Sequence, residues 1–474
     1  MKNVIFALFL SVIFASCGGN SEQSSNTVDV ELQIRKRIIT SDSIAAGVKY
    51  VSEKIIDKNN PPKVLDYSLS RQGSIGLDIS QYASSVEYVR FRHPAADSSG
   101  QFFRNIGIHY SYERGASTGN FSSMVILMDE GYIIGDILSG LYHYDLSGNI
   151  IDTIVVNNVP YKFDKGYGSD TVIHVKYTDI HGFISGGQNI GSEVVYNFRD
   201  TSSKTTTYWY DLNHKMITME RHYKDGENVF YPNVLNDSIT YDLSFAFLSD
   251  DAVFLRVFDK IGDTLALFKD VSHERVRPKG NTNSPESPVV YNFGGKLHIR
   301  ASYNDTVYVM EAPNRLVAKY VINLGERRVD PQTGMMGNKS EKLLPQRWME
   351  TDDFILFTYS QNIDVPNTRN NNQVQYYYTI FDKKSGKIHT LDAGGRYPNE
   401  FIVPNRIEGG IPFYFSGLYY SDRKGAYHVV YDKRGLKQLL NDKNVNNLPQ
   451  IQRAKLKEMH DSIEDGELLM MLMK

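Results

Sequence analysis

The chain has 474 residues, of which 41% are hydrophobic and 23% charged, and its formal net charge is −3 at pH 7. This composition is typical of a folded protein and excludes a chain that is disordered throughout. A pI near 6.5 excludes a broad basic surface for nucleic acid. A single cysteine excludes an internal disulfide framework and a cysteine-rich zinc module. The length allows two or three domains, or one large domain built of repeats.

The first residues follow the order of a secretion signal. Lys2 supplies a positive charge, an apolar run follows over residues 4–14, and small residues precede Cys17. The apolar run is shorter than the roughly 20 residues that span a bilayer. We therefore expect a cleaved signal peptide over residues 1–16. Residues 17–28 are small and polar, which indicates a flexible tether.

Phe14-Ala15-Ser16-Cys17 resembles the lipobox of bacterial lipoproteins. The resemblance implies that Cys17 becomes the lipid-bearing N-terminus of the mature chain, and Gly18 implies sorting to the outer membrane. Several acyl chains make a stable membrane anchor, where a single chain is marginal. The alternative is a plain signal peptide followed by a cysteine without lipid. We expect a chain held at the cell envelope through its N-terminal lipid.

Between residues 70 and 440, short runs of Tyr, Phe, Val, Ile and Thr alternate with Gly, Asn and Asp, which indicates strands and turns. Six of these runs share one hairpin pattern: an aromatic residue (Met in one degenerate copy), an acid, a turn and a second apolar strand. The acids are Asp145, Asp211, Asp259, Glu311, Asp382 and Asp432. Their spacing indicates a unit of about 50 residues with two insertions, the size of a four-stranded propeller blade.

The repeated acids precede turns, so we expect them to accept hydrogen bonds from turn amides rather than to bind a ligand. The pairs Asp250-Asp251 and Asp352-Asp353 also favour turns over a general acid and base, because adjacent residues on a strand point to opposite faces. Residues 182–191, 273–288 and 366–373 are rich in Gly, Pro, Asn and Ser, and we expect exposed loops there.

The C-terminal part carries a different pattern. Residues 448–463 predict a short amphipathic helix, since Ile451, Leu456, Met459 and Ile463 lie near helical spacing. The apolar run 468–473 predicts a final strand that joins an open blade edge.

The predicted fold is all-β: a six-bladed β-propeller of four-stranded antiparallel blades over residues 67–445. An N-terminal segment over 29–66 precedes it, and a C-terminal helix and closing strand over 446–474 follow it.

The chain resembles the six-bladed β-propeller lipoproteins of Bacteroides-type bacteria. The resemblance rests on the lipobox, the opening strands around Ile79 and residues 86–89, the repeated hairpins, and the acidic turn and apolar strand at the C-terminus. Residues 395–401 are similar to that family's Gly-x-Gly-Pro-x-Glu-Tyr turn, although Tyr397 stands where the family has Gly. Most members have no known activity, so the resemblance implies a fold and a location but no reaction.

Chemical motifs are scarce. The twelve histidines show no close metal-ligand spacing, although a site across blades could still draw on His109, His174, His181 and His298. We expect no metal, no cofactor and no catalytic residue. Arg90 and Arg92 share one face of a strand and either contact an anionic ligand or guard an edge strand. The candidate ligand contacts are Arg90, Arg92, Arg396 and Tyr397.

The leading hypothesis is a lipid-anchored, non-catalytic binding or scaffold protein of the envelope, whose ligand is a glycan or a partner protein. Function would then lie in loops on a rigid ring. One alternative is a propeller hydrolase, lyase or lactonase that acts on extracellular carbohydrate, which requires several titratable side chains to converge at one mouth of the channel. A sensor subunit coupled to a membrane partner is the other.

Overall fold

The computed structural model describes residues 38–40, 53–67, 74–75, 77–92, 123–136, 140–156, 163–165, 173–175, 182–190, 193–200, 205–222, 230–236, 238–244, 252–259, 263–270, 286, 288–336, 341–361, 375–391, 402–421, 424–464 and 467–474. The expected signal peptide, Cys17, Asp250-Asp251, residues 366–373, Arg396 and Tyr397 lie outside these ranges. Within them, no helix is long and apolar enough to cross a bilayer.

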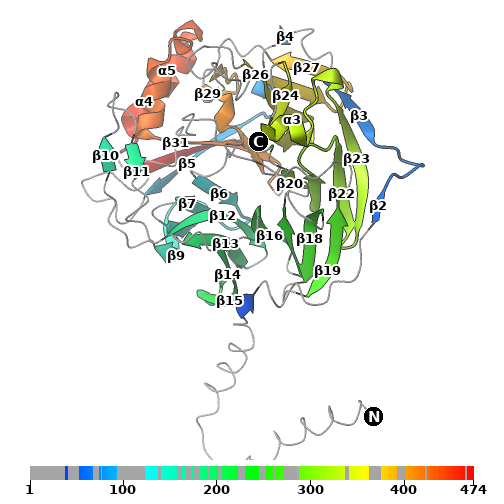
Figure 1. The fold of residues 1–474 in the computed structure, drawn as a ribbon. Coiled ribbons are helices and arrows are strands. Elements are labelled where there is room, and N and C mark those ends of the chain that lie inside the picture. Colours follow the sequence, from blue (N-terminus) through cyan, green and yellow to red (C-terminus); the bar gives the residue numbers. More distant parts are fainter. Residues whose placement is uncertain are drawn as a thin grey trace, which may run out of the picture.

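The sheets stand around a common centre, so the chain folds as an all-β propeller with few helices (Figure 1). Five blades each contain four antiparallel strands that follow one another in the chain.

The first blade contains β6 (Ser123–Leu127), β7 (Tyr132–Asp136), β8 (Gly140–Tyr144) and β9 (Ile150–Val156). The second contains β12 (Gly182–Ile190), β13 (Glu193–Asp200), β14 (Thr205–Asp211) and β15 (Met216–His222). The third contains β16 (Phe230–Asn236), β17 (Ile239–Leu243), β18 (Val253–Asp259) and β19 (Thr264–Lys269). The fourth contains β20 (Val289–Phe293), β21 (Lys296–Arg300), β22 (Thr306–Ala312) and β23 (Arg315–Asn323). The fifth contains β24 (Leu343–Glu350), β25 (Phe354–Gln361), β26 (Gln375–Asp382) and β27 (Ile388–Leu391).

A further sheet, here called the closing sheet, combines both ends of the chain. Its order is β30 (Tyr419–Ser421), β31 (Ala426–Asp432), β32 (Glu467–Met473) and β5 (Val86–Arg92). The C-terminal strand β32 was expected at a blade edge but lies inside this sheet, because β5 pairs with its far side from Glu467↔Arg92 to Met473↔Val86. The N-terminal strand therefore covers the edge that the C-terminal strand would otherwise leave open.

The prediction of six blades is wrong, because the residues that the structure describes form five blades of four consecutive strands. The repeat expected at Asp432 is interrupted: its carboxylate accepts a hydrogen bond from Gly435 N and caps helix α4 (Lys433–Asn441) instead of a hairpin turn. An aspartate is a favourable residue at a helix N-terminus for the same reason that it is favourable in a turn, since it accepts from free amides.

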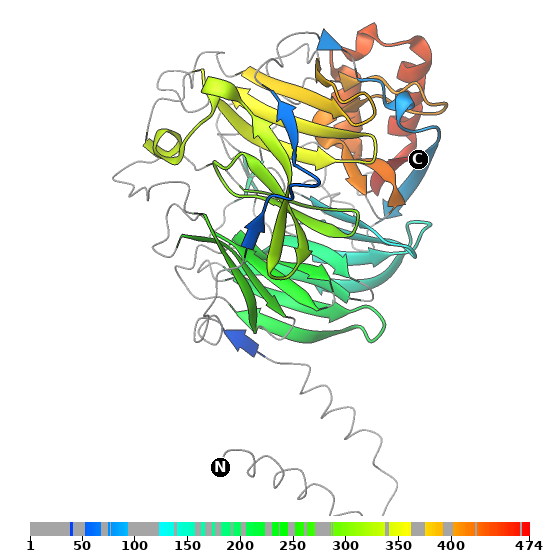
Figure 2. The same cartoon turned by 90° about the vertical axis from the view of Figure 1, so that its right-hand side faces the viewer.

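The prediction of purely antiparallel blades is also wrong. Four N-terminal strands extend three blades in parallel: β1 (Ile38–Thr40) pairs with β15, β2 (Glu53–Ile55) and β3 (Lys63–Asp66) with β23, and β4 (Ser74–Ile75) with β27. Figure 2 shows N-terminal strands, in blue, on the outside of the sheets. These strands have two to four residues, which is too short for an alternating pattern to appear in the sequence.

Smaller elements complete the described chain. Two-stranded sheets pair β10 (Phe163–Lys165) with β11 (Ile173–Val175) and β28 (Ile402–Val403) with β29 (Phe413–Tyr414). The helices are α3 (Pro331–Met336), α4, α5 (Gln450–Ser462), and the 3-10 turns η1 (Ile79–Gln81), η4 (Gly325–Arg327), η7 (Phe415–Gly417) and η9 (Val445–Asn447). Helix α5 confirms the predicted helix, with Leu456 and Met459 buried, but Ile451 is 78% exposed and does not belong to its buried face.

Four of the six repeated acids accept hydrogen bonds in the turns between the third and fourth strands of the blades, as predicted; the exceptions are Asp432, which caps α4, and Glu311, which lies on β22 and pairs with the side chain of Lys296. Asp145 accepts hydrogen bonds from Ser147 N and Asn149 N, both at 2.8 Å. Asp211, Asp259 and Asp382 likewise accept from amides two to four residues later. The hydrogen bonds from Asn149 lower the pKa of Asp145. These carboxylates therefore stabilise hairpins. Asp352-Asp353 also lies at a turn, between β24 and β25.

Two expected loops differ from the prediction. Residues 182–190 form strand β12, with a bulge between Ile184 and Gly186 that accommodates the glycines within a sheet. Of the segment 273–288 the structure describes residues 286 and 288, and Glu286 is buried and pairs with the guanidinium of Arg300, so this residue does not lie in an exposed loop.

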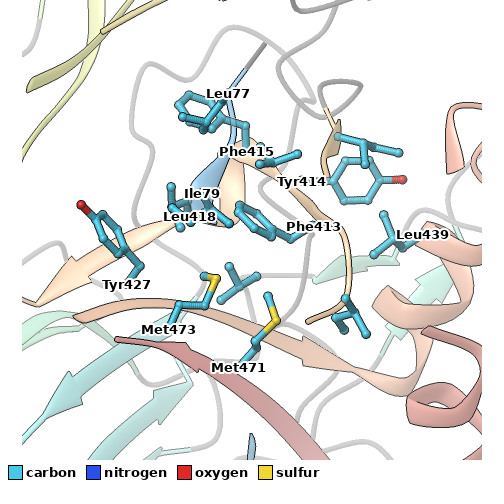
Figure 3. Packing of buried hydrophobic residues seen from close by; sticks show 14 of the residues in the cluster. Leu77, Ile79, Phe413, Tyr414, Phe415, Leu418, Tyr427, Leu439, Met471 and Met473 are labelled. Carbon is cyan, nitrogen blue, oxygen red and sulfur yellow. The ribbon is translucent and has the colours of Figure 1, made fainter. Parts of the chain in front are cut away.

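A core beside the closing sheet joins the two ends of the chain. Leu77 and Ile79 lie near Phe413, Phe415 and Leu418, with Met471 and Met473 of β32 below them (Figure 3). Burial of these side chains stabilises the fold by about 1.5–3 kcal/mol for each large residue. The closing sheet is therefore held by packing as well as by strand pairing.

Candidate functional site

Two lysine ammonium groups and two tyrosine hydroxyls surround the carboxylate of Glu350, at the end of β24. Its carboxylate is buried between the fourth and fifth blades, with a side chain that is 0% exposed. An ionised carboxylate at such a position is stable only when donors and opposite charges surround it. Four side chains donate to this carboxylate. We call them, together with Glu350 and a neighbouring histidine, the Glu350 cluster. Its members are Tyr291, His298, Lys319, Tyr320, Glu350 and Lys383.

Both oxygens of Glu350 are occupied. Oε2 accepts a hydrogen bond from the hydroxyl of Tyr291 at 2.6 Å, and Oε1 accepts one from Tyr320 at 2.7 Å. The ammonium nitrogens of Lys319 and Lys383 lie 3.3 and 2.9 Å from the same Oε1. Three of these donors come from the fourth blade and one from the fifth, so the carboxylate joins the two blades.

A β-bulge brings Lys319 to this carboxylate. In the pairing of β22 with β23, Val307 opposes Tyr320 and Tyr308 opposes Ala318, which leaves Lys319 as the extra residue. Adjacent residues of a regular strand point to opposite faces. The bulge changes this local orientation, so that Lys319 and Tyr320 both reach Glu350.

His298 occupies the other side of Lys319. Its Nδ1 lies 3.1 Å from the carbonyl oxygen of Lys296, which can only accept, so Nδ1 carries the proton. Its Nε2 then accepts from Lys319 Nζ at 2.9 Å. Burial lowers the pKa of His298 to about 4, and the neighbouring Lys319 charge acts in the same direction. The imidazole is therefore neutral at pH 7, and both its nitrogens are engaged.

The remaining protonation states follow from the same contacts. Burial on its own would raise the pKa of Glu350, but the charges of Lys319 and Lys383 and the Tyr291 hydroxyl lower it overall. Burial and the Glu350 charge raise the pKa of Tyr291 and Tyr320, so both hydroxyls keep their protons and donate. Burial lowers the pKa of Lys319, although Glu350 opposes that effect.

Aromatic rings line the cluster. Lys383 Nζ lies 4.1 Å and Lys319 Nζ 5.2 Å from the ring centre of Phe293. Tyr291 stacks on the imidazole of His298 at 4.8 Å, and its ring lies 6.0 Å from that of Trp348. Cations within about 6 Å of a ring face gain roughly 0.5–2 kcal/mol, so Phe293 helps to fix both ammonium groups.

The cluster can hold charge, but it does not present a free base. A general base needs an available lone pair and a pKa near the working pH. Glu350 already accepts from four donors, and the Nε2 lone pair of His298 is taken by Lys319. The side chains of the two lysines, by contrast, are partly exposed, at 31% for Lys319 and 22% for Lys383.

From the sequence, His298 was a candidate only for a metal site built across blades, and the structure places it against an ammonium group. His174 lies on β11, and His109 and His181 lie outside the described residues. Groups of three or more His, Cys, Asp or Glu that could hold a metal do not occur among the described residues. The cluster itself escaped prediction, although a lysine inside the strand run VAKYV and a glutamate that ends the buried run of β24 are its sequence signals.

Arg90 and Arg92 lie on β5, the edge strand of the closing sheet. Arg90 donates to the carbonyl oxygen and the hydroxyl of Ser462 at 2.9 and 2.7 Å. Arg92 pairs with Glu464 at 2.7 Å and with Glu467 at 3.0 Å. Both guanidinium groups thus hold the end of α5 and the turn after it, which fits the expectation of charged residues on an edge strand. The other two candidate contacts, Arg396 and Tyr397, lie outside the described residues.

A family model described as a domain of unknown function, DUF4933, matches residues 45–442. The chain belongs to this family. The DUF4933 match spans all five consecutive-strand blades and ends after α4. No curated protein matches the sequence.

The fold of this DUF4933 chain is similar to those of several solved structures. A Bacteroides fragilis protein described as exported, known by its crystal structure, is 12% identical with a TM-score of 0.53, and the match covers 87% of this chain and 100% of that one. A weaker match is BamB from Moraxella catarrhalis, with 12% identity and a TM-score of 0.25 over 64% of this chain and 78% of that one. Another is a glucose dehydrogenase-type oxidoreductase of a Thermus species, with 9% identity and a TM-score of 0.33 over 75% of this chain and 98% of that one. The first likeness supports the fold alone.

Proposed function

We propose that this chain is an envelope protein that binds a glycan or a partner protein without transforming it. The observation that carries the proposal is the state of the Glu350 cluster. Its carboxylate and its imidazole are both saturated by intramolecular contacts, while its two lysine side chains are partly exposed to solvent. Such a site holds and presents charge rather than moving protons.

The rigidity of the ring supports a binding role. Strand pairing and a shared core fasten the closing sheet, and the Glu350 cluster joins the fourth and fifth blades. A rigid scaffold places its binding groups in advance, which lowers the entropy lost when a ligand binds.

The envelope location belongs to the same proposal and rests on the sequence of residues 1–18 and on its resemblance to a lipobox. We propose that Cys17 carries lipid and that the mature chain lies at the outer membrane. The similar Bacteroides fragilis protein is described as exported, which agrees with this location. A Cys17→Ala variant of the full chain should leave the membrane fraction, whereas a Cys17 chain should be retained and labelled by radioactive palmitate. Equal retention of both chains contradicts the lipid anchor.

The binding function is tested with the full chain immobilised through its N-terminus. A glycan array and a pull-down from envelope extract should each be compared with a chain in which Lys319 and Lys383 are both replaced by methionine. Ligand that binds the natural chain and not the double variant supports the proposal. Silence on the array and in the pull-down, or turnover of any glycan on the array by the natural chain, overturns it.

A further inference from the structure

We infer that Lys319 and Lys383 form an oxyanion subsite that takes a carboxylate, sulfate or phosphate group of the ligand. This inference rests on the proposed binding function and names the chemistry of what is bound. The two lysines come from different blades, Lys319 from β23 and Lys383 from the turn after β26. Both ammonium nitrogens lie within 3.3 Å of one oxygen atom of Glu350, so they are close neighbours in space.

The cluster carries an excess of positive charge. One carboxylate, that of Glu350, faces two ammonium groups, and the neighbouring histidine and tyrosines are neutral at pH 7. A third cation, Lys296, adds to the positive field at Lys319, while its own ammonium group pairs with Glu311 at 2.7 Å. Charges that are partly withdrawn from water interact more strongly than charges at an open surface. A second anion is therefore favoured next to the two lysines.

Each ammonium group also has a donor left for a ligand. An ammonium group has three N–H donors. The described contacts of Lys319 use two, toward His298 Nε2 and Glu350 Oε1. Those of Lys383 also use two, toward Glu350 Oε1 and the carbonyl oxygen of Thr351. An oxyanion can accept from both remaining donors, and charge-assisted hydrogen bonds of this kind are among the stronger ones in proteins.

The groups are preorganised. Glu350 holds both lysines through one oxygen, and the Phe293 ring contacts both ammonium groups at 4.1 and 5.2 Å. A lysine on an open surface loses roughly 0.5–1.5 kcal/mol of side-chain entropy when it is immobilised by a ligand. Here the fold has already ordered both side chains. Their exposed fractions of 31% and 22% leave them accessible from solvent.

The glycan of the proposed function should accordingly be an acidic one, with a uronate carboxylate or a sulfate ester. Lysine recognises these groups, and inorganic phosphate, by the same charge. The probes are therefore D-glucuronate, glucose 6-sulfate, sodium sulfate and sodium phosphate, with D-glucose and sodium chloride at equal ionic strength as the neutral and screening controls.

Trp348 provides the signal, because its ring lies 6.0 Å from that of Tyr291 in the cluster and the chain has only two tryptophans. In a Trp209→Phe background, the fluorescence of Trp348 should change saturably with at least one of the sulfate and glucuronate probes and should not respond to glucose. Lys319→Met and Lys383→Met should each weaken that response at least tenfold. Lys296→Met, the matched control at a neighbouring lysine, should change it less than threefold.

Circular dichroism and thermal unfolding establish that each variant is folded. If Lys319→Met does not fold, the Lys383→Met and Lys296→Met pair still tests the subsite. Absence of saturable binding by all four anions to the natural chain overturns the inference, as does equal weakening by Lys296→Met and Lys383→Met.

The two proposals fail separately. Anion binding that depends on Lys383, combined with silence on the glycan array and in the pull-down, leaves the subsite in place and removes the proposed function. Array or pull-down binding that is unaffected by the Lys319 and Lys383 substitutions keeps a binding function and removes the subsite.

Discussion

The hydroxyl of Tyr291 on β20 donates a 2.6 Å hydrogen bond to Glu350 on β24, across the boundary between two blades. Blades of a propeller otherwise meet through apolar packing, and this boundary also has it, through Trp348, Phe357 and Tyr320. The charged contact adds a requirement that packing does not impose: the carboxylate must stay ionised and fully paired. Stability and binding are therefore linked at this one residue.

Glu350→Gln should destabilise the protein by about 3–5 kcal/mol, because it leaves two partly buried ammonium groups without their shared counter-charge. Glu311→Gln is the matched control: Glu311 also pairs with a lysine, but at an exposed site, where an ion pair contributes about 1 kcal/mol or less. Urea unfolding measures both. Adding Lys383→Met to Glu350→Gln should recover part of the loss. Equal effects of the two glutamate substitutions contradict the proposed role of Glu350.

His298 should make the protein less stable at mildly acidic pH. Its pKa in the folded chain is about 4, below its ordinary value of 6.5, so the unfolded chain takes up the proton first as the pH falls. The stabilisation by the neutral imidazole is complete above about pH 7 and declines as the pH falls from about 6.5 toward 4, with about 2 kcal/mol lost by pH 5. Urea unfolding at pH 7 and pH 5 measures this loss.

His298→Gln should make the difference between pH 7 and pH 5 smaller. The charged groups that face His298 are Lys319, Glu350 and Lys383. The lowered pKa of Glu350 acts mainly below its ordinary value of 4.5, so it contributes little in this window. Burial also lowers the pKa of His143 in the first blade. The pH dependence of a His143→Gln variant is therefore measured beside that of His298→Gln. A pH dependence that is unchanged in His298→Gln contradicts the assignment.

Gly148→Ala should be strongly destabilising. Gly148 has φ of +85°, and a Cβ atom there would lie 1.9 Å from the carbonyl oxygen of Arg90 on β5. The turn between β8 and β9 therefore needs glycine both for its backbone and for its contact with the closing sheet. Gly425→Ala is the control, because Gly425 has φ of +56° and a Cβ atom there would meet no atom within 4 Å. We expect Gly425→Ala to lower the free energy of unfolding by about 1 kcal/mol, because of its backbone conformation. Gly148→Ala should lower it by at least twice that amount, as measured by thermal unfolding.

Replacing Phe91 by alanine should destabilise the protein much more than replacing Arg92, although the two residues are neighbours on β5. Phe91 is 0% exposed and makes edge contacts with Tyr132 and Tyr144 of the first blade at 5.3 and 5.2 Å. Phe91→Ala should cost about 3–5 kcal/mol. Arg92 is itself mostly exposed in its ion pairs with Glu464 and Glu467, so Arg92→Ala should cost about 1 kcal/mol or less. A larger loss for Arg92 than for Phe91 in urea unfolding would mean that charge, not packing, joins the closing sheet to the first blade.

Local patterns made the hairpins of the fold predictable. An acid before a tight turn is a short-range signal, and Asp145, Asp211 and Asp382 all accept from the turn amides. The same local rule failed at Asp432, because an aspartate accepts hydrogen bonds from free backbone amides both at the start of a helix and in a hairpin turn.

Long-range pairing is what the sequence did not reveal. The parallel strands β1 to β4 are too short to have a period, and the position of β32 between β31 and β5 depends on a partner more than 370 residues away, as in Glu467↔Arg92. The Glu350 cluster likewise draws residues from four strands and a turn, and only a bulge at Lys319 completes it. No spacing rule describes such a convergence.

Binding can be separated from catalysis in one experiment, a time course of proton NMR spectra of a glucuronate-containing disaccharide with the full chain at equal concentration. Binding without catalysis predicts saturable line broadening of the sugar signals that Lys383→Met removes, with no new anomeric signals over several days. New product signals whose rate of appearance falls in Glu350→Gln or His298→Gln would contradict a purely binding role, because they would show that the cluster transforms what it binds.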